Sequence, residues 1–284
     1  MGRDYNSELS IKAGLPPGTL IHVGDKKVEE PKLTLVEYNE DTLEVHVSQD
    51  IDIIKDLEFA ENRNIWINVD GLHQTELIEG IGKLFGVHPI VLEDILNTNQ
   101  RPKTESYEDY IYVTIRTLFY GRLENTVNSD QISLILGNNF ILSFQEIGTD
   151  LFTKIRQRLE RPAGNIRKRG VDYLTYSLID SIVDNYYLLL EDLGEEIERL
   201  EDELIKEPSS ATLQRIHELK REMIFLRKSL WPLRETIASL QRDESGLIKE
   251  STGIYLRDLY DHSIQVIETV ETYREMLSGM LDLY

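Results

Sequence analysis

The sequence offers acidic side chains, rather than a nucleophile or a thiolate, as its candidates for chemistry. Glu93 and Asp94 stand together in the second turn of a helix that Pro89 should begin, flanked by the apolar residues Leu92 and Ile95. Neighbouring helical positions point about 100° apart, so the two carboxylates can serve two different cation sites but cannot easily share one ion.

Two further acidic pairs lie in predicted helices. Asp180 and Asp184 share one face of a long helix because they are four positions apart, and Asp258 and Asp261 occupy the first turns of the last helix. Solvated acidic pairs are common on helix surfaces. The spacing alone therefore leaves two interpretations of each pair open, a solvated face or a set of cation ligands.

Other kinds of site find little support in the sequence. The chain has no Cys, and its six His are scattered without an HxxxH pair, which argues against a structural zinc site. Any metal would meet oxygen ligands, which Mg²⁺ and Ca²⁺ prefer. No phosphate-binding glycine loop, GxSxG or HExxH motif is present. We therefore do not expect an enzyme, and a metal-dependent hydrolase is the least favoured class.

The charge balance limits the kinds of partner. The 51 acidic and 31 basic residues give a net charge of −20, which argues against nucleic acid or an anionic membrane surface as the main partner. It fits cation binding, and it equally fits plain solubility. The first residues lack the apolar core of a signal peptide, and no segment approaches the roughly 18 apolar residues of a membrane span. We expect the chain as it stands to be soluble and cytoplasmic.

Residues 1–165 alternate between strand and helix patterns, which predicts an α/β/α layered domain around a mixed sheet. The β-branched run at 65–69 is typical of a buried strand, and Gly137-Asn138-Asn139 predicts a hairpin. Strands are expected at 19–23, 33–38, 43–47, 65–69, 110–120, 132–136 and 140–144, and helices at 75–85, 89–97 and 150–159.

Residues 166–250 should form a long antiparallel helical pair. Apolar residues keep a spacing of three to four over 174–204 and again over 213–240, with a break between the two runs. Pro232 lies inside the second helix and should bend it or remove one hydrogen bond. Near the tip, residues 191–207 hold nine acids and two bases. This segment is either a solvated face or a field that concentrates cations.

Residues 251–284 contain the third predicted helix, with Ser251-Thr252-Gly253 marking a break before it. Its apolar positions from Leu259 to Tyr284 step by four and three, a heptad seam that requires partner helices. We expect this helix to leave the body of the domain, to expose a seam that one chain cannot bury alone, and to continue beyond Tyr284. The expected fold class is thus α+β, a layered domain followed by long helices.

Five segments, in family order over nearly the whole chain, resemble the CorA family of magnesium and cobalt channels. HP-x-x-LEDIL followed by QRPK, and WPLRE, are specific when they occur together. The segments are 14–20 (GLPPGTL), 86–96 (GVHPIVLEDIL) with 100–103 (QRPK), 176–180 (YSLID), 230–235 (LWPLRE) and 257–262 (RDLYDH).

The resemblance implies a homopentamer in the cell membrane, with this part of the chain in the cytoplasm. Residues 251–284 would begin a stalk helix that leads into a first membrane span, which this sequence lacks together with the Gly-Met-Asn signature. The resemblance also implies regulatory Mg²⁺ ions between neighbouring subunits. Asp94 would face Asp258 at one site, and Glu93 and Asp180 would form an adjacent one. Bound Mg²⁺ would hold the channel closed, and Co²⁺ is expected to substitute for it.

Two points stay open in the sequence. Asn99 stands where the family commonly has His before QRPK, so an amide oxygen or a water would complete the second site. Ion selectivity is also undetermined without the pore, because a related zinc transporter shares this architecture. A coiled-coil scaffold without a metal role is a further alternative, but it accounts for the helical half only.

Overall fold

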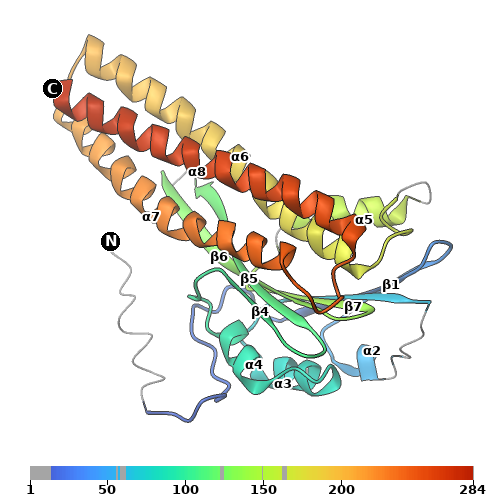
Figure 1. Cartoon of the computed structure of the whole chain (residues 1–284). Helices are drawn as coiled ribbons and strands as arrows, with labels where there is room; N and C mark the ends of the chain where they lie inside the picture. The colour runs from blue at the N-terminus through green and yellow to red at the C-terminus, as the bar shows by residue number, and fades with distance from the viewer. Residues whose placement is uncertain are drawn as a thin grey trace.

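The computed structural model of the chain describes residues 14–55, 57, 62–121, 125–148, 150–161 and 165–283. A layered domain lies at one end, and three long helices cross it and extend away from it (Figure 1). This arrangement is the α+β fold predicted from the sequence.

A seven-stranded mixed sheet forms the centre of the layered domain. Its order is β2-β1-β3-β7-β6-β5-β4, and β3 pairs in parallel with β7 while the other neighbours are antiparallel. The strands are β1 (Lys32–Tyr38), β2 (Leu43–Ser48), β3 (Asn64–Asp70), β4 (Lys103–Ser106), β5 (Ile111–Gly121), β6 (Thr126–Leu136) and β7 (Phe140–Gln145).

Helices cover both faces of this sheet, so its central strands are buried on both sides. In β3, alternate residues enter two separate cores: Ile65 and Ile67 pack in one, and Trp66 packs in the other. The first core includes α2 (Asp52–Lys55), α3 (Thr75–Leu84) and α4 (Pro89–Leu96); the second includes a 3₁₀ turn (Asp150–Phe152), α5 (Thr153–Glu160) and the long helices.

The long helices are α6 (Val171–Lys206), α7 (Ser210–Gln241) and α8 (Glu250–Leu283). α6 and α7 run in opposite directions, as predicted. α8 lies between them and packs more extensively against each than they pack against one another (Figure 1). None of the helices within the described residues has an apolar stretch long enough to cross a membrane.

The heptad seam of α8 is buried inside the chain. Leu259, Val266, Val270 and Leu277 are at most 1% exposed, because α6 and α7 cover them. The expectation that this helix leaves the body and exposes an unpartnered seam is therefore wrong for the described residues. Tyr284, the last position of the predicted seam, lies outside them.

Three local predictions also differ from the structure. Residues 19–23 do not form a strand; Val23 makes a single parallel bridge with Asn97. The edge strand β4 was not predicted, because its sequence KTES is polar and it pairs with β5 only. The predicted break at Ser251-Thr252-Gly253 lies inside α8, which begins at Glu250.

The acidic tip at 191–207 is an exposed helix face on which some of the acids are paired with bases. Arg199 forms salt bridges with Glu196 and Glu203 along the same helix, and Arg215 of α7 contacts Glu196 at 3.1 Å. Its apolar positions, Leu193, Ile197, Leu200 and Leu204, are buried. This pairing favours the solvated-face interpretation of the segment.

Candidate metal-binding site

Helix α4 positions the first two candidate acids. At its N-cap, Nδ1 of His88 accepts a hydrogen bond from the backbone N–H of Ile90 at 3.2 Å, and Pro89 takes the first helical position. The apolar side of the helix packs into the core, which leaves Glu93 and Asp94 half-buried at its edge. The core residues of α4 are Val91, Leu92, Ile95 and Leu96.

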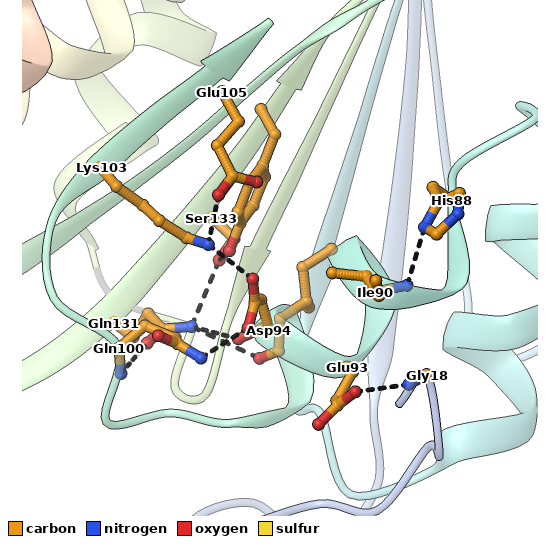
Figure 2. A network of polar contacts seen from close by, with 12 residues as sticks. Gly18, His88, Ile90, Glu93, Asp94, Gln100, Lys103, Glu105, Gln131 and Ser133 are labelled. Atoms are coloured by element: carbon orange, nitrogen blue, oxygen red, sulfur yellow. Dashed lines mark hydrogen bonds and ion pairs between the residues drawn. The ribbon is translucent and has the colours of Figure 1, made fainter. Parts of the chain in front are cut away.

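Asp94 is held by one ammonium and one amide. Nζ of Lys103 donates to its Oδ2 at 2.7 Å, and Nε2 of Gln100 donates to its Oδ1 at 2.6 Å (Figure 2). Burial disfavours the Lys103 ammonium, but hydrogen bonds and charges from Asp94 and Glu105 outweigh it and raise the pKa of Lys103. The Asp94 carboxylate therefore already has the positive charge of Lys103 beside it, in the position that a bound metal ion would take.

Glu93 points to a different neighbour. Its Oε2 accepts a hydrogen bond from the backbone N–H of Gly18 at 2.6 Å (Figure 2). Gly18 adopts a φ of +82°, and an added Cβ would lie 3.1 Å from Cβ of Pro89, so the 14–20 segment needs glycine to lie this close to α4. The two adjacent carboxylates diverge, as helical geometry predicts.

Asp180 and Asp258 lie near one another in the long-helix layer. Burial raises the pKa of the Tyr176 hydroxyl most. The negative charge of Asp180 raises it further, and that of Asp258 contributes a smaller rise. Asp258 is 68% exposed, and its Oδ2 lies 3.8 Å from Nε2 of His262 one turn further along α8. The structure thus gathers these acids of α6 and α8 around one tyrosine and one histidine.

Asp180 is the most perturbed of the candidate acids. Burial and repulsion from Asp184 raise its pKa to about 6, although a hydrogen bond from Tyr176 and the charges of His262 and Arg158 act against the rise. A carboxyl group in this environment favours a bound cation, because the cation stabilises its ionised form.

One chain does not bring the two pairs of acids together. Glu93 and Asp94 belong to α4 on one face of the sheet, whereas Asp180 and Asp258 belong to α6 and α8 on the other (Figure 1). Each pair keeps part of its surface accessible. An ion held by Asp94 and Asp258, or by Glu93 and Asp180, therefore requires a second copy of the chain.

A different group of residues is close enough to share an ion within one chain. Across the part of the chain that the structure describes, Glu37, Glu44 and His46 form the one trio of acidic and histidine side chains that meets this condition. Arg63 already bridges the two carboxylates at 3.0 and 2.9 Å, so their charge is partly compensated. The trio lies on β1 and β2, away from the predicted acids.

Sequence reasoning missed the partners of these acids. Gln100 and Lys103 were noted only as parts of QRPK, and His262 only as part of RDLYDH. The Asp258–His262 contact has a signal in the sequence, since the residues are four positions apart on a helix. The Asp94–Lys103 contact has none, because it depends on where a short turn directs β4.

Comparison with known proteins decides the family. A family model described as "CorA-like Mg2+ transporter protein" matches residues 61–284. The chain belongs to this CorA-like family. It is 44% identical over 277 residues to the cobalt/magnesium transport protein CorA of Thermotoga maritima, spanning 97% of this chain and 78% of that protein. A putative metal ion transporter of Bacillus subtilis is 25% identical over 77% of this chain and 67% of its own length.

Solved structures share the fold of this CorA-family chain. The soluble domain of CorA from Methanocaldococcus jannaschii superposes with a TM-score of 0.73 at 21% identity, covering 87% of this chain and 95% of that one. The ZntB cytoplasmic domain from Vibrio parahaemolyticus gives a TM-score of 0.68 at 18% identity, covering 88% and 96%. At these identities the likeness concerns the fold alone.

Proposed function

We propose that this chain is the Mg²⁺-sensing part of a channel for Mg²⁺ and Co²⁺, and that it acts in a ring of five copies. Mg²⁺ bound between neighbouring copies holds the ring, and the pore attached to it, in a closed arrangement. In the cell this part lies in the cytoplasm, beneath a pore in the membrane. The 44% identity to a cobalt/magnesium transport protein supports the choice of ion.

The observation that carries the proposal is the division of the four acids between two faces of the molecule. Asp94 and Glu93 are presented by α4, and Asp258 and Asp180 by α8 and α6. When the α4 face of one copy meets the long-helix face of the next, each contact brings together one acid of each pair. Asp94 with Asp258 then forms one ion site, and Glu93 with Asp180 forms the other.

The residues fit a hard divalent cation. All four donors are carboxylate oxygens, which Mg²⁺ prefers, and Mg²⁺ keeps several waters, so two protein ligands per ion are sufficient for modest affinity. Asn99 can complete the second site through its amide oxygen or a water. When the ion is absent, two carboxylates about 4 Å apart repel by roughly 4 kcal/mol at an effective dielectric near 20. The ion removes this repulsion.

Sensing follows from a difference in affinity. The closed ring places the acids at a distance where one ion binds both, and a tilted ring does not. High Mg²⁺ therefore shifts the population toward the closed ring, and low Mg²⁺ releases it. Each copy carries a net charge of −20, so repulsion between copies assists release.

Sedimentation of the 284-residue chain tests the proposal. We expect association to increase when about 20 mM MgCl₂ is added, and Asp94→Asn to remove most of that increase. Because the α8 seam is buried within one chain, a folded monomer is expected at low protein concentration without Mg²⁺. Association that is equal with and without Mg²⁺ at every protein concentration would contradict the clamp.

Zinc transport is the second candidate, since the ZntB cytoplasmic domain shares the fold. Comparing Mg²⁺ with Zn²⁺ in the same sedimentation series separates the two ions. A response to micromolar Zn²⁺ with none to millimolar Mg²⁺ would favour the zinc alternative. A scaffold without a metal role predicts no response to either ion.

A further inference from the structure

The ammonium of Lys103 occupies the position of a cation between two carboxylates. Its Nζ lies 2.7 Å from Oδ2 of Asp94 and 2.7 Å from Oε1 of Glu105 (Figure 2). The exposed fractions are 31% for the Lys103 side chain, 15% for Asp94 and 36% for Glu105. These contacts are less screened than those of a fully exposed ion pair.

The fold fixes the lysine in this place. Lys103 begins β4, where it pairs in register with Thr114 of β5, and its Nζ lies 5.6 Å from the ring centroid of Tyr112. Glu105 is itself held, because the Tyr107 hydroxyl donates to its Oε2 at 3.1 Å. The ammonium can therefore release Asp94 and keep Glu105 as its partner without leaving the site.

The same strand is attached to the long helices. The hydroxyl of Thr104 donates to the backbone carbonyl of Thr236 in α7 at 3.0 Å, and the hydroxyl of Ser106 donates to Asp243 at 2.8 Å. Just before β4, Arg101 and Pro102 line a cavity of about 370 Å³ together with residues of the WPLRE segment: Trp231, Pro232, Arg234 and Glu235. The QRPK and WPLRE segments, 130 positions apart in the chain, thus lie together, and Gln100 and Lys103 of the first contact Asp94.

From these contacts we infer that Lys103 is a built-in competitor for the divalent ion at Asp94. The lysine neutralises Asp94 when no ion is bound, and when an ion binds it releases Asp94 and keeps its contact with Glu105 alone. Binding must break the Asp94–Lys103 pair, so this pair sets the Mg²⁺ concentration at which the domain responds. Because β4 is hydrogen-bonded to α7, and α7 packs against α8, a movement of Lys103 is transmitted to the long helices.

This inference rests on the proposed role of Asp94 as a Mg²⁺ ligand, and a set of four variants tests the two separately. The measurement is the Mg²⁺ dependence of Tm at one protein concentration and constant ionic strength. Fitting it with RT ln(1 + [L]/Kd) gives an apparent Kd for Mg²⁺, which is called the midpoint below. The variants are Lys103→Met, Lys83→Met, Glu105→Gln and Asp94→Asn. Lys83 is the matched control, because it is 72% exposed on α3 and loses the same charge.

We expect Lys103→Met to lower the midpoint about fivefold, the factor for an ion pair at the upper end of the exposed range. Lys83→Met should leave it within about twofold. Glu105→Gln should raise the midpoint, because Lys103 then has Asp94 as its only carboxylate partner among these residues. This variant shifts the response in the opposite direction, so it tests the inference even if Lys103→Met folds poorly.

The outcomes separate the two claims. If Asp94→Asn removes the Mg²⁺ response but Lys103→Met and Glu105→Gln respond like the Lys83→Met control, the competitor role is wrong and the ion site stands. If Asp94→Asn responds like the wild type, the ion site is wrong, and the inference fails with it.

Discussion

The carboxylate of Asp172, in the first turn of α6, accepts a hydrogen bond from the hydroxyl of Thr252, in the first turn of α8, at 2.6 Å. The same Oδ2 accepts the backbone N–H of Lys249 at 3.1 Å. Asp172 is 3% exposed and Thr252 is 2% exposed. This contact fixes the start of α8 against the start of α6 and so sets the direction in which α8 runs.

Removing this contact should destabilise the whole helical layer. We expect Asp172→Ala to lower the free energy of unfolding by about 2 kcal/mol, because two hydrogen bonds to a carboxylate are lost and one of the donors, the Thr252 hydroxyl, stays buried. Asp202→Ala, which removes an exposed salt bridge to Lys206, should change it by less than about 0.5 kcal/mol. Urea unfolding measures both. Equal, small effects would show that Asp172 does not hold α8.

The raised pKa of Asp180 predicts a stability change with pH. Its pKa is about 6 in the folded chain against an ordinary value of 3.8, so the folded state binds more protons between these values. The contribution of Asp180 to the free energy of unfolding therefore decreases as pH rises from about 4 to 6. Relative to wild type, Asp180→Asn should gain about 2 °C in Tm above pH 6.5, after allowance for solvent screening, and little at pH 4.

The control for this prediction is the ion itself. Adding about 20 mM Mg²⁺ at pH 7.5 should narrow the difference in Tm between Asp180→Asn and wild type, because a bound cation stabilises ionised Asp180. A difference that stays constant from pH 4 to pH 7.5, with and without Mg²⁺, would contradict the raised pKa.

The acidic tip should have no part in Mg²⁺ sensing. Four of its acids are exposed: Glu191, Glu195, Glu198 and Glu201. Replacing all four with Gln should leave the apparent Kd for Mg²⁺, obtained from the Mg²⁺ dependence of Tm, unchanged within about twofold. Titrating the quadruple variant beside the wild type checks this. A midpoint that rises several-fold at low ionic strength and recovers with added salt would instead support cation concentration by the tip.

Most of the layered half of the fold, apart from β4 and residues 19–23, was predictable, because its signals are local. The run at 65–69 and the Gly137-Asn138-Asn139 turn determine a buried strand and a hairpin without reference to distant residues. The course of α8 was not predictable in this way. A heptad seam shows that partner helices exist, but it does not show whether they belong to the same chain. The start of α8 depends on Asp172, 80 positions away from Thr252.

The candidate site was predictable to a different extent. Adjacent helical positions require Glu93 and Asp94 to diverge, and the structure shows that they do. Pairing Asp94 with Asp258 came from family resemblance, and it stays a prediction, since one chain places them on opposite faces of the sheet. The Asp94–Lys103 contact could not be found from spacing, because a turn of irregular backbone positions the lysine.

Glu93 should contribute to Mg²⁺ binding independently of Asp94. Because the two carboxylates point to different neighbours, Glu93→Gln should remove only part of the Mg²⁺-dependent rise in Tm. The amide oxygen of Gln can still accept the hydrogen bond from Gly18, so the fold should be kept. Thermal unfolding with and without MgCl₂ measures the effect. Loss of the entire rise would indicate a single shared ion rather than two sites.

The Mg²⁺-dependent rise in Tm of the Asp94→Asn, Asp258→Asn double variant tests the central claim most directly. Wild type should melt higher as Mg²⁺ increases, following RT ln(1 + [L]/Kd), and the double variant should lose most of that gain while keeping its fold. The matched control is Asp41→Asn, Asp282→Asn, which removes two exposed acids outside the candidate sites and should respond like wild type. If Mg²⁺ raises the Tm of the Asp94→Asn, Asp258→Asn variant as much as that of the wild type, these residues do not form the clamp.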